Sequence, residues 1–154
     1  MRAFSMSGPA GERLPRGSIG EVMHAGAVRV RPSEGIPALR HLLLERRVGA
    51  VPVVSSDGRP VGIVSGPDLL RSLLVGGTPP TTAGEIMSHE VLALPITASI
   101  AQAAALMSYE GVDLIVITDP DGRVAGVVQA LDIARWHARA SGYLVDRVED
   151  DLAA

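Results

Sequence analysis

The chain has 154 residues, with 47% hydrophobic and 20% charged residues, a formal net charge of −3 and no cysteine. This length and composition fit one compact domain, or two small halves with a shared core, and exclude a chain that is disordered throughout. The lack of cysteine excludes disulfides, thiolate metal sites and cysteine nucleophiles, and the acidic balance argues against nucleic-acid binding. The sequence has no run apolar enough for a signal peptide or a membrane span, so we expect a cytoplasmic protein.

The first half of the chain predicts a turn, a strand, a helix, a hairpin and a second helix. The apolar runs AVPVVS and VGIVS flank Asp57-Gly58, and an Asp-Gly step between β-branched runs is a strong signal for a β-hairpin. Because both runs are apolar throughout, we expect these strands to be covered on both faces. In chain order, the predictions are a flexible segment over 1–17, a helical turn over 19–23, a strand over 27–30, a helix with Leu39, Leu42 and Leu43 at helical spacing, the hairpin, a helix over 67–74 and a linker over 76–83.

The second half repeats the first at a constant offset of 64, without a gap. Gly62 matches Gly126, and Asp68 matches Asp132. A repeat of this kind predicts paired units, each of which buries its apolar face against the other. The corresponding predictions are a helical turn over 84–87, a strand over 91–94, a helix with Ile100, Ala103, Ala104 and Met107 behind a Ser99–Gln102 capping box, a hairpin around Asp121-Gly122, a helix over 131–140 and an acidic tail over 141–154.

Each unit ends in an aspartate at the start of its last helix. Ser65-x-x-Asp68, with Pro67 between them, fits a capping box, which would be a purely structural role. Gln129 is a poor N-cap, yet Asp132 keeps its place three residues on, which favours a further role for the aspartate. A carboxylate has enough lone pairs to accept hydrogen bonds from two neighbouring hydroxyls, so it suits the cis-diol of a ribose.

The order of elements and the endings GIVSGPD and GVVQALD resemble the CBS domain, and the tandem copies resemble a CBS pair over about Ser18 to Ala140. The resemblance implies an α/β fold of two pseudo-symmetric repeats, each strand-helix-strand-strand-helix, packed through their sheets and spanning 18–75 and 84–140. It also rests on shorter matches at Val22-Met23, Gly49 to Val54, Asp57-Gly58, Ile86-Met87, Gly111-Val112 and Asp121-Gly122.

The resemblance implies a regulatory module rather than an enzyme. Such pairs bind adenosine derivatives, among them AMP, ADP, ATP and S-adenosylmethionine, in clefts between the repeats, require no cofactor, often form homodimers and signal to an effector protein. The ribose and phosphate residues that it implies are Ser65, Pro67, Asp68, Gln129 and Asp132. The adenine residues that it implies are Val112, Asp113 and Leu114 for the cleft of Asp68, and Val48, Gly49 and Ala50 for the cleft of Asp132.

The phosphate side departs from the family pattern. Relatives that bind nucleotides often place a basic residue where this chain has Gly49-Ala50 and Asp113-Leu114. This departure argues against AMP or ATP and leaves adenosine-like ligands or S-adenosylmethionine more open. Four arginines either reach a phosphate or belong to a solvated face, namely Arg46, Arg47, Arg71 and Arg135.

Other function classes remain open to different degrees. A ligand-free module for dimerisation or protein association is the main alternative, supported by Gln129 and by the missing basic residues. An enzyme has little support, because the chain contains no G-x-S-x-G elbow, no P-loop and no G-x-G-x-x-G fingerprint, and we name no catalytic residue. The histidines show no metal-binding spacing with carboxylates, so we expect no metal site.

Overall fold

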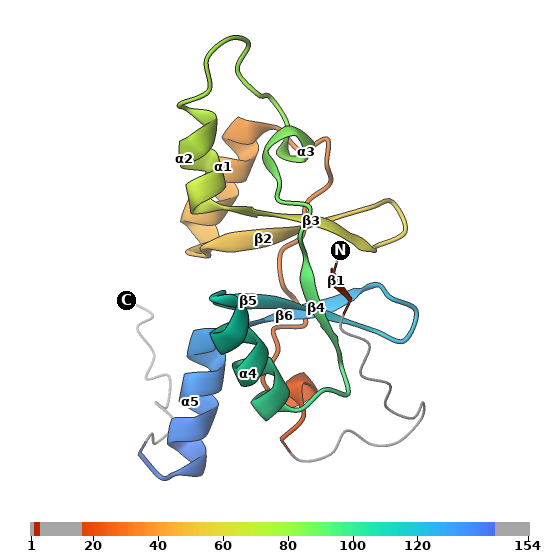
Figure 1. The fold of residues 1–154 in the computed structure, drawn as a ribbon, viewed down its shortest axis with the longest axis vertical. Coiled ribbons are helices and arrows are strands. Elements are labelled where there is room, and N and C mark those ends of the chain that lie inside the picture. The colour runs from red at the N-terminus through yellow and green to blue at the C-terminus, as the bar shows by residue number, and fades with distance from the viewer. Residues whose placement is uncertain (1, 4–16, 144–154) are drawn as a thin grey trace, which may run out of the picture.

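The computed structural model describes residues 2–3 and 17–143 (Figure 1). The predicted flexible segment and acidic tail lie outside this part, except at Arg2–Ala3, Gly17 and 141–143. In chain order, the elements are β1 (Arg2–Ala3), η1 (Ile19–Glu21), α1 (Ile36–Arg46), β2 (Ala50–Val54), β3 (Pro60–Ser65), α2 (Gly66–Ser72), α3 (Ala83–Ile86), β4 (Leu92–Pro95), α4 (Ile100–Glu110), β5 (Leu114–Thr118), β6 (Val124–Gln129) and α5 (Ala130–Ala140).

Two sheets lie next to each other at the centre, with α1 and α2 on the outer side of one and α4 and α5 on the outer side of the other (Figure 1). One sheet is the antiparallel hairpin β2–β3, and the other has the order β1-β4-β5-β6, in which only β5 and β6 pair antiparallel. Both hairpins turn at a glycine with positive φ, Gly58 at +84° and Gly122 at +81°, a conformation that glycine adopts without steric cost. The predicted α/β fold of two tandem repeats is confirmed.

Strands β2 and β5 are buried on both faces, as expected, whereas every second residue of β3 is only half-buried. The core has three parts. One part lies between the two sheets and joins Val54 of β2 to Val116 of β5 and Val127 of β6. The other two lie under the helices of each half, around Leu39 in the first and Ile115 in the second. None of the helices within the described residues is long and apolar enough to cross a membrane.

Each opening turn packs against the other half of the chain. Ile19 of η1 is fully buried with Leu94 and Ile115 of the second half, and its N–H donates to the carbonyl of Ala98 at 2.8 Å. Ala83 of α3 is buried in the core of the first half, and its N–H donates to the carbonyl of Glu34 at 2.8 Å. The two repeats of the sequence therefore exchange their first elements when they fold.

The repeated glycine of β3 and β6 allows this exchange. A Cβ at Gly62 would lie 2.9 Å from the carbonyl oxygen of Ser88, and one at Gly126 would lie 2.7 Å from that of His24. The segment around His24 approaches β6 so closely that the N–H of His24 donates to the carbonyl of Val127 at 2.9 Å. Gly126 thereby brings His24 to the end of β6, where the motif aspartate follows.

The strand predicted over 27–30 is reduced to an isolated bridge between Val30 and Val53. The N–H of Val30 donates to the carbonyl of Pro52 at 3.1 Å, but a longer parallel ladder would need an N–H from Pro52, which proline lacks. The equivalent position in the second half is Val116, which pairs with Ala93, and there β4 forms as a true strand. The sequence predicts no strand at Arg2–Ala3, where β1 pairs with the outer edge of β4.

Candidate functional site

Asp68 is buried at the start of α2 and is fully engaged by its own half. Its Oδ2 accepts hydrogen bonds from the Ser65 N–H at 2.8 Å and from the Ser65 hydroxyl at 2.7 Å, and its Oδ1 accepts one from Arg71 Nη2 at 2.9 Å. The N–H of Asp68 donates in return to Ser65 Oγ, which completes the predicted capping box. The carboxylate thus stabilises the first turn of α2 and holds the guanidinium one turn further along.

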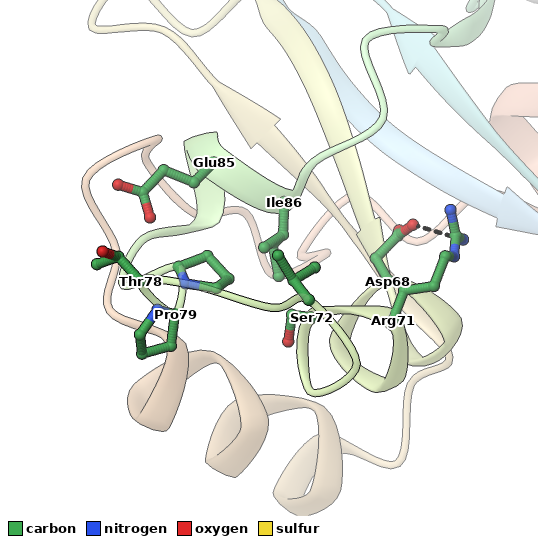
Figure 2. A pocket seen from close by; sticks show the side chains of 9 residues that line it. Asp68, Arg71, Ser72, Thr78, Pro79, Glu85 and Ile86 are labelled. Atoms are coloured by element: carbon green, nitrogen blue, oxygen red, sulfur yellow. Dashed lines mark hydrogen bonds and ion pairs between the residues drawn. The ribbon is translucent and has the colours of Figure 1, made fainter.

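The cavity beside Asp68 has a volume of about 430 Å³ and lies between α2, the following linker and α3 (Figure 2). Figure 2 shows the Asp68 carboxylate turned towards Arg71 and away from Thr78 and Pro79. The cavity does not include the predicted adenine residues Val112–Leu114. Its one buried carboxylate, that of Asp68, is already paired with Ser65 and Arg71, so it offers less to a ribose than an unpaired carboxylate would.

A second cavity, of about 640 Å³, lies where the two halves meet. It brings together most of the predicted residues other than the two aspartates, and they come from equivalent positions of both halves. These residues are Ser65, Pro67, Gln129, Gly49, Ala50 and the segment Val112–Leu114. Asp113 is exposed there, and neither motif aspartate lines the cavity, so it lacks a buried acceptor for a diol.

The third cavity, of about 680 Å³, contains the other motif aspartate, and both halves build it. The first half contributes the segment from Met23 to Val28, the end of α1, and Val48 and Ala50; the second half contributes Gln129 and Asp132. Four residues predicted for the Asp132 cleft thus line one cavity, while Gly49 lines the second cavity instead. We call this space the Asp132 cavity.

The side chain of Asp132 is only 9% exposed and is held in a fixed orientation. Its Oδ2 accepts a hydrogen bond from the Gln129 N–H at 2.8 Å, and its Oδ1 lies 2.8 Å from Nε2 of His24. Asp132 therefore caps α5 although no serine precedes it. The argument that the poor N-cap Gln129 favours a further role for Asp132 over a capping role is wrong. The capping contact comes from the aspartate itself, so it does not depend on which side chain precedes it.

Three of the four arginines named from the sequence, Arg46, Arg47 and Arg135, line the Asp132 cavity. Arg46 and Arg47 stand at the end of α1, whereas Arg135 lies one turn after Asp132 on α5. The fourth, Arg71, pairs with Asp68 in the first half. The lining thus combines the largely buried Asp132 with three arginines, a combination that the sequence analysis did not resolve.

His24 is the residue of this cavity that sequence reasoning did not connect to Asp132. The two are 108 positions apart, and no local pattern links them. The available signal was the repeated glycine at 126, because a strand glycine often marks the close approach of another backbone. Within residues 17–143, no cluster of three histidine, aspartate or glutamate side chains is placed to hold a metal ion.

Comparison with known proteins shows the family to which the chain belongs. The CBS domain matches twice, over residues 19–75 and 83–139. Protein MK0525 of Methanopyrus kandleri is 27% identical over 137 residues, which cover 88% of this chain and 68% of that protein. These matches confirm the resemblance found in the motifs.

Two solved structures share the fold. The CBS domain pair of protein MJ0100, solved with 5′-methylthioadenosine and S-adenosylmethionine, superposes with a TM-score of 0.73 at 21% identity, over 82% of this chain and 99% of that one. CBSX2 of Arabidopsis thaliana, solved with AMP, gives a TM-score of 0.74 at 23% identity, over 80% of this chain and 98% of that one. With both repeats matched and the same architecture in these pairs, the chain belongs to the CBS domain family and forms a CBS domain pair.

Proposed function

We propose that this CBS pair is a regulatory module that binds an adenosine derivative in the Asp132 cavity and signals its occupancy to a partner protein. The observation that carries the proposal is the nearly buried carboxylate of Asp132 in the wall of a cavity of about 680 Å³ that both halves build. The ligands held by the pairs of MJ0100 and CBSX2 support the choice of an adenosine derivative.

In this proposal, the two ribose hydroxyls donate to the carboxylate oxygens of Asp132. Each oxygen has two acceptor sites, and the contacts with Gln129 and His24 use one on each, so the carboxylate keeps capacity for a diol. Val48 and Ala50, from the first half, offer an apolar wall for the flat face of adenine. A deoxyribose would lose one of the two hydrogen bonds and bind more weakly.

The proposed way in which the ligand is signalled to a partner follows from the fact that both halves build the cavity. Its walls come from both halves, so a ligand that contacts both favours the arrangement of the halves that it fits best. A partner protein that binds one arrangement better than the other then senses the ligand through this difference in affinity. No chemical step is needed, and we propose a module without catalytic activity, in which any regulated reaction belongs to the partner.

Thermal melts against adenosine, AMP, ADP, ATP, S-adenosylmethionine and GTP test the proposal. A ligand at 100 times its Kd adds about 2.7 kcal/mol to the free energy of unfolding, which raises Tm by about 5–10 °C for a chain of this size. We expect a shift with adenine ligands but not with GTP, lost in Asp132→Asn and kept in Asp68→Asn, the matched substitution in the other half. A panel without any shift would contradict the proposal.

A second candidate function is association through the helices of the first half. Large apolar side chains are exposed at the end of α2 and on its neighbour α1, namely Leu70, Leu73, Leu74, Val75 and Leu44. We propose that a second copy of this chain covers them in a homodimer, because a two-fold axis would place the same apolar face of each copy against that of the other. Sedimentation velocity over a wide concentration range tests this, with Leu73→Lys expected to give monomers; a wild-type monomer at every concentration would contradict it.

A further inference from the structure

The two hairpin turns of the chain contact each other. Both turns read Asp-Gly-Arg, at the constant offset of 64, and they project to the same side of the molecule (Figure 1). The N–H of Val124 donates to the carbonyl of Gly58 at 2.9 Å, and Nε of Arg123 donates to the carbonyl of Asp57 at 3.0 Å. The hairpin of the second half is therefore hydrogen-bonded to the backbone of the turn in the first half. We call these contacts between the turns the turn junction.

Two arginines of the first half extend the turn junction. Nη1 of Arg29 donates to the carbonyl of Val124 at 2.8 Å. The guanidinium of Arg59 lies against Gly122, so closely that a Cβ on this glycine would be 2.6 Å from Nη1. Since Arg123 reaches the first turn in the same way, each half places an arginine on the hairpin of the other.

The backbone contact of the turn junction runs in one direction only, because of a proline. The counterpart of Val124 at the offset of 64 is Pro60. Proline has no N–H, so the first hairpin cannot return the hydrogen bond that Val124 gives to Gly58. The side chain of Arg123 supplies a second hydrogen bond in the same direction, which makes it the side chain to change in a test of the junction.

The other ends of the same two hairpins are separated by cavities. In the register of the strands, Ala50 pairs with Ser65 and Leu114 pairs with Gln129, at the ends opposite to the turns. All four residues line the cavity of about 640 Å³ between the halves, and Ala50 and Gln129 also line the Asp132 cavity. None of the three cavities described above includes a residue of either turn. The halves thus make direct backbone contact at one end of their hairpins and border cavities at the other.

The length of the strands gives this difference a mechanical consequence. Strand β3 has six residues and spans about 20 Å, at about 3.3 Å per residue. If the halves change their relative angle about the turn junction, the displacement grows with distance from it and is largest at the cavities. Hinges of this kind are formed by a few residues in loops or at the ends of elements.

We propose that the turn junction is the fixed end about which the two halves change their angle when a ligand binds in the Asp132 cavity. The inference rests on the proposed function, because it assumes a ligand that contacts both halves. Arg123 is then a positioning residue, which lines no cavity described above but keeps the walls of the Asp132 cavity close to the arrangement that the ligand needs. Loosening the junction leaves more freedom to be lost on binding, which weakens the complex.

A structural explanation competes with this one. The apolar core between the sheets also joins the halves, and in this explanation the turn junction only adds to the free energy of unfolding. Arg123→Gln would then lower Tm and leave the affinity for adenosine unchanged. Our proposal predicts that Arg123→Gln also weakens adenosine binding. Arg40→Gln is the matched control, because Arg40 is exposed on α1, lines no cavity described above and loses the same charge.

A disulfide across the turn junction gives a sharper test. A Cβ placed on Gly58 lies 3.8 Å from Cβ of Arg123, which is a usual Cβ–Cβ distance in a disulfide. The chain has no cysteine, so Gly58→Cys/Arg123→Cys forms only this crosslink within one chain. Isothermal titration with adenosine compares its reduced and oxidised forms, and Gly58→Ser/Arg123→Ser is the control that cannot form a crosslink. Circular dichroism verifies that each variant is folded, because Gly58 has a φ of +84°, which strains any side chain there.

We expect the reduced cysteine variant to bind adenosine about 2- to 10-fold more weakly than wild type, since it lacks the hydrogen bond of Arg123. Oxidation restores the affinity, because the disulfide fixes the same end of the halves. The serine variant binds as weakly as the reduced form and does not respond to the oxidant. Arg123→Gln is weakened to a similar degree, and Arg40→Gln binds as wild type.

Each other outcome has a distinct meaning. If oxidation weakens adenosine binding, the halves move apart at the turns when the ligand binds, and the inference is wrong. If the reduced, oxidised and wild-type proteins bind adenosine equally, the inference is also wrong and the proposed function stands. If the cysteine variant does not fold, equal affinities of Arg123→Gln and Arg40→Gln would contradict the inference in its place. If wild type binds no adenosine, the proposed function is overturned and the inference with it.

Discussion

Nε2 of His24 lies 2.8 Å from Oδ1 of Asp132, so a residue at the entrance of the first half contacts the motif aspartate of the second. The contact occurs at the Asp132 cavity, which both residues line. His24 is 59% exposed at its side chain, whereas Asp132 is nearly buried. Any ligand that uses Oδ1 therefore approaches a carboxylate that already has a partner from the other half of the chain.

We expect His24→Ala to bind adenosine more tightly than wild type does. Without the imidazole, a ribose hydroxyl no longer shares Oδ1 with a second donor, and a net hydrogen bond of about 0.5–1.5 kcal/mol sets an upper limit of about 2- to 10-fold on the gain. Isothermal titration measures the gain, and Asp132→Asn serves as the variant that cannot bind. A weaker complex in His24→Ala would instead mean that the imidazole contacts the ligand.

Gly126→Ala should destabilise the protein by about 1–3 kcal/mol, the usual range for overpacking a dense interior. The new Cβ would lie 2.7 Å from the carbonyl oxygen of His24 and 3.3 Å from Cα of Ala25, and backbone atoms cannot rotate away. Gly66→Ala is the matched control, because its Cβ would meet nothing within 4 Å. Urea denaturation of both variants checks this, and equal stability would contradict the close approach of the two segments.

Asp68→Ala should reduce stability without affecting adenosine binding. It removes the acceptor of two hydrogen bonds from Ser65 and the partner of Arg71, and loss of a helix cap costs about 1–2 kcal/mol. Denaturation combined with adenosine titration separates the two effects. Loss of binding in a folded Asp68→Ala protein would show that the ligand site lies at the first motif instead of the second.

The lowered pKa of Asp57 predicts that this residue's contribution to the free energy of unfolding depends on pH. A hydrogen bond from the Ser55 hydroxyl holds the pKa of this carboxyl below its ordinary value, with a smaller contribution from Arg59, whose Nε lies 3.1 Å away. Because the folded pKa is the lower one, the contribution is full above the unfolded pKa of about 4 and disappears as the pH falls through the folded pKa. The difference in Tm between wild type and Asp57→Asn should therefore be full at pH 7 and become smaller as the pH falls below about 4. A difference that stays constant over this pH range would contradict this.

The fold was largely predictable because its strongest signals are local. Asp57-Gly58 and its repeat fixed the two hairpins, and the Ser99–Gln102 capping box forms with N–O distances of 2.9 and 3.0 Å. The constant offset then showed that both halves share one architecture. The strand over 27–30 was not predictable from its own residues, since its length is limited by Pro52 on the neighbouring strand.

The site was less predictable because its contacts join distant segments. The motif identified Asp132 and its surroundings but not His24, which reaches it only after the opening turns exchange between the halves. The left-handed conformation of Arg47 could have been inferred by comparison with Gly111, because a glycine that follows a helix often adopts it. The two aspartates differ in their partners, because Asp68 pairs with Arg71 and Asp132 contacts His24, and periodicity carries no information on that point.

The central claim is that an adenosine derivative binds at Asp132. The most direct measurement is the stoichiometry of adenosine binding by isothermal titration in wild type, Asp132→Asn and Asp68→Asn, with folding of each verified by circular dichroism. The account predicts about one adenosine per chain in wild type and in Asp68→Asn, and none in Asp132→Asn. Equal binding by Asp132→Asn and wild type, or loss of binding only in Asp68→Asn, would contradict it.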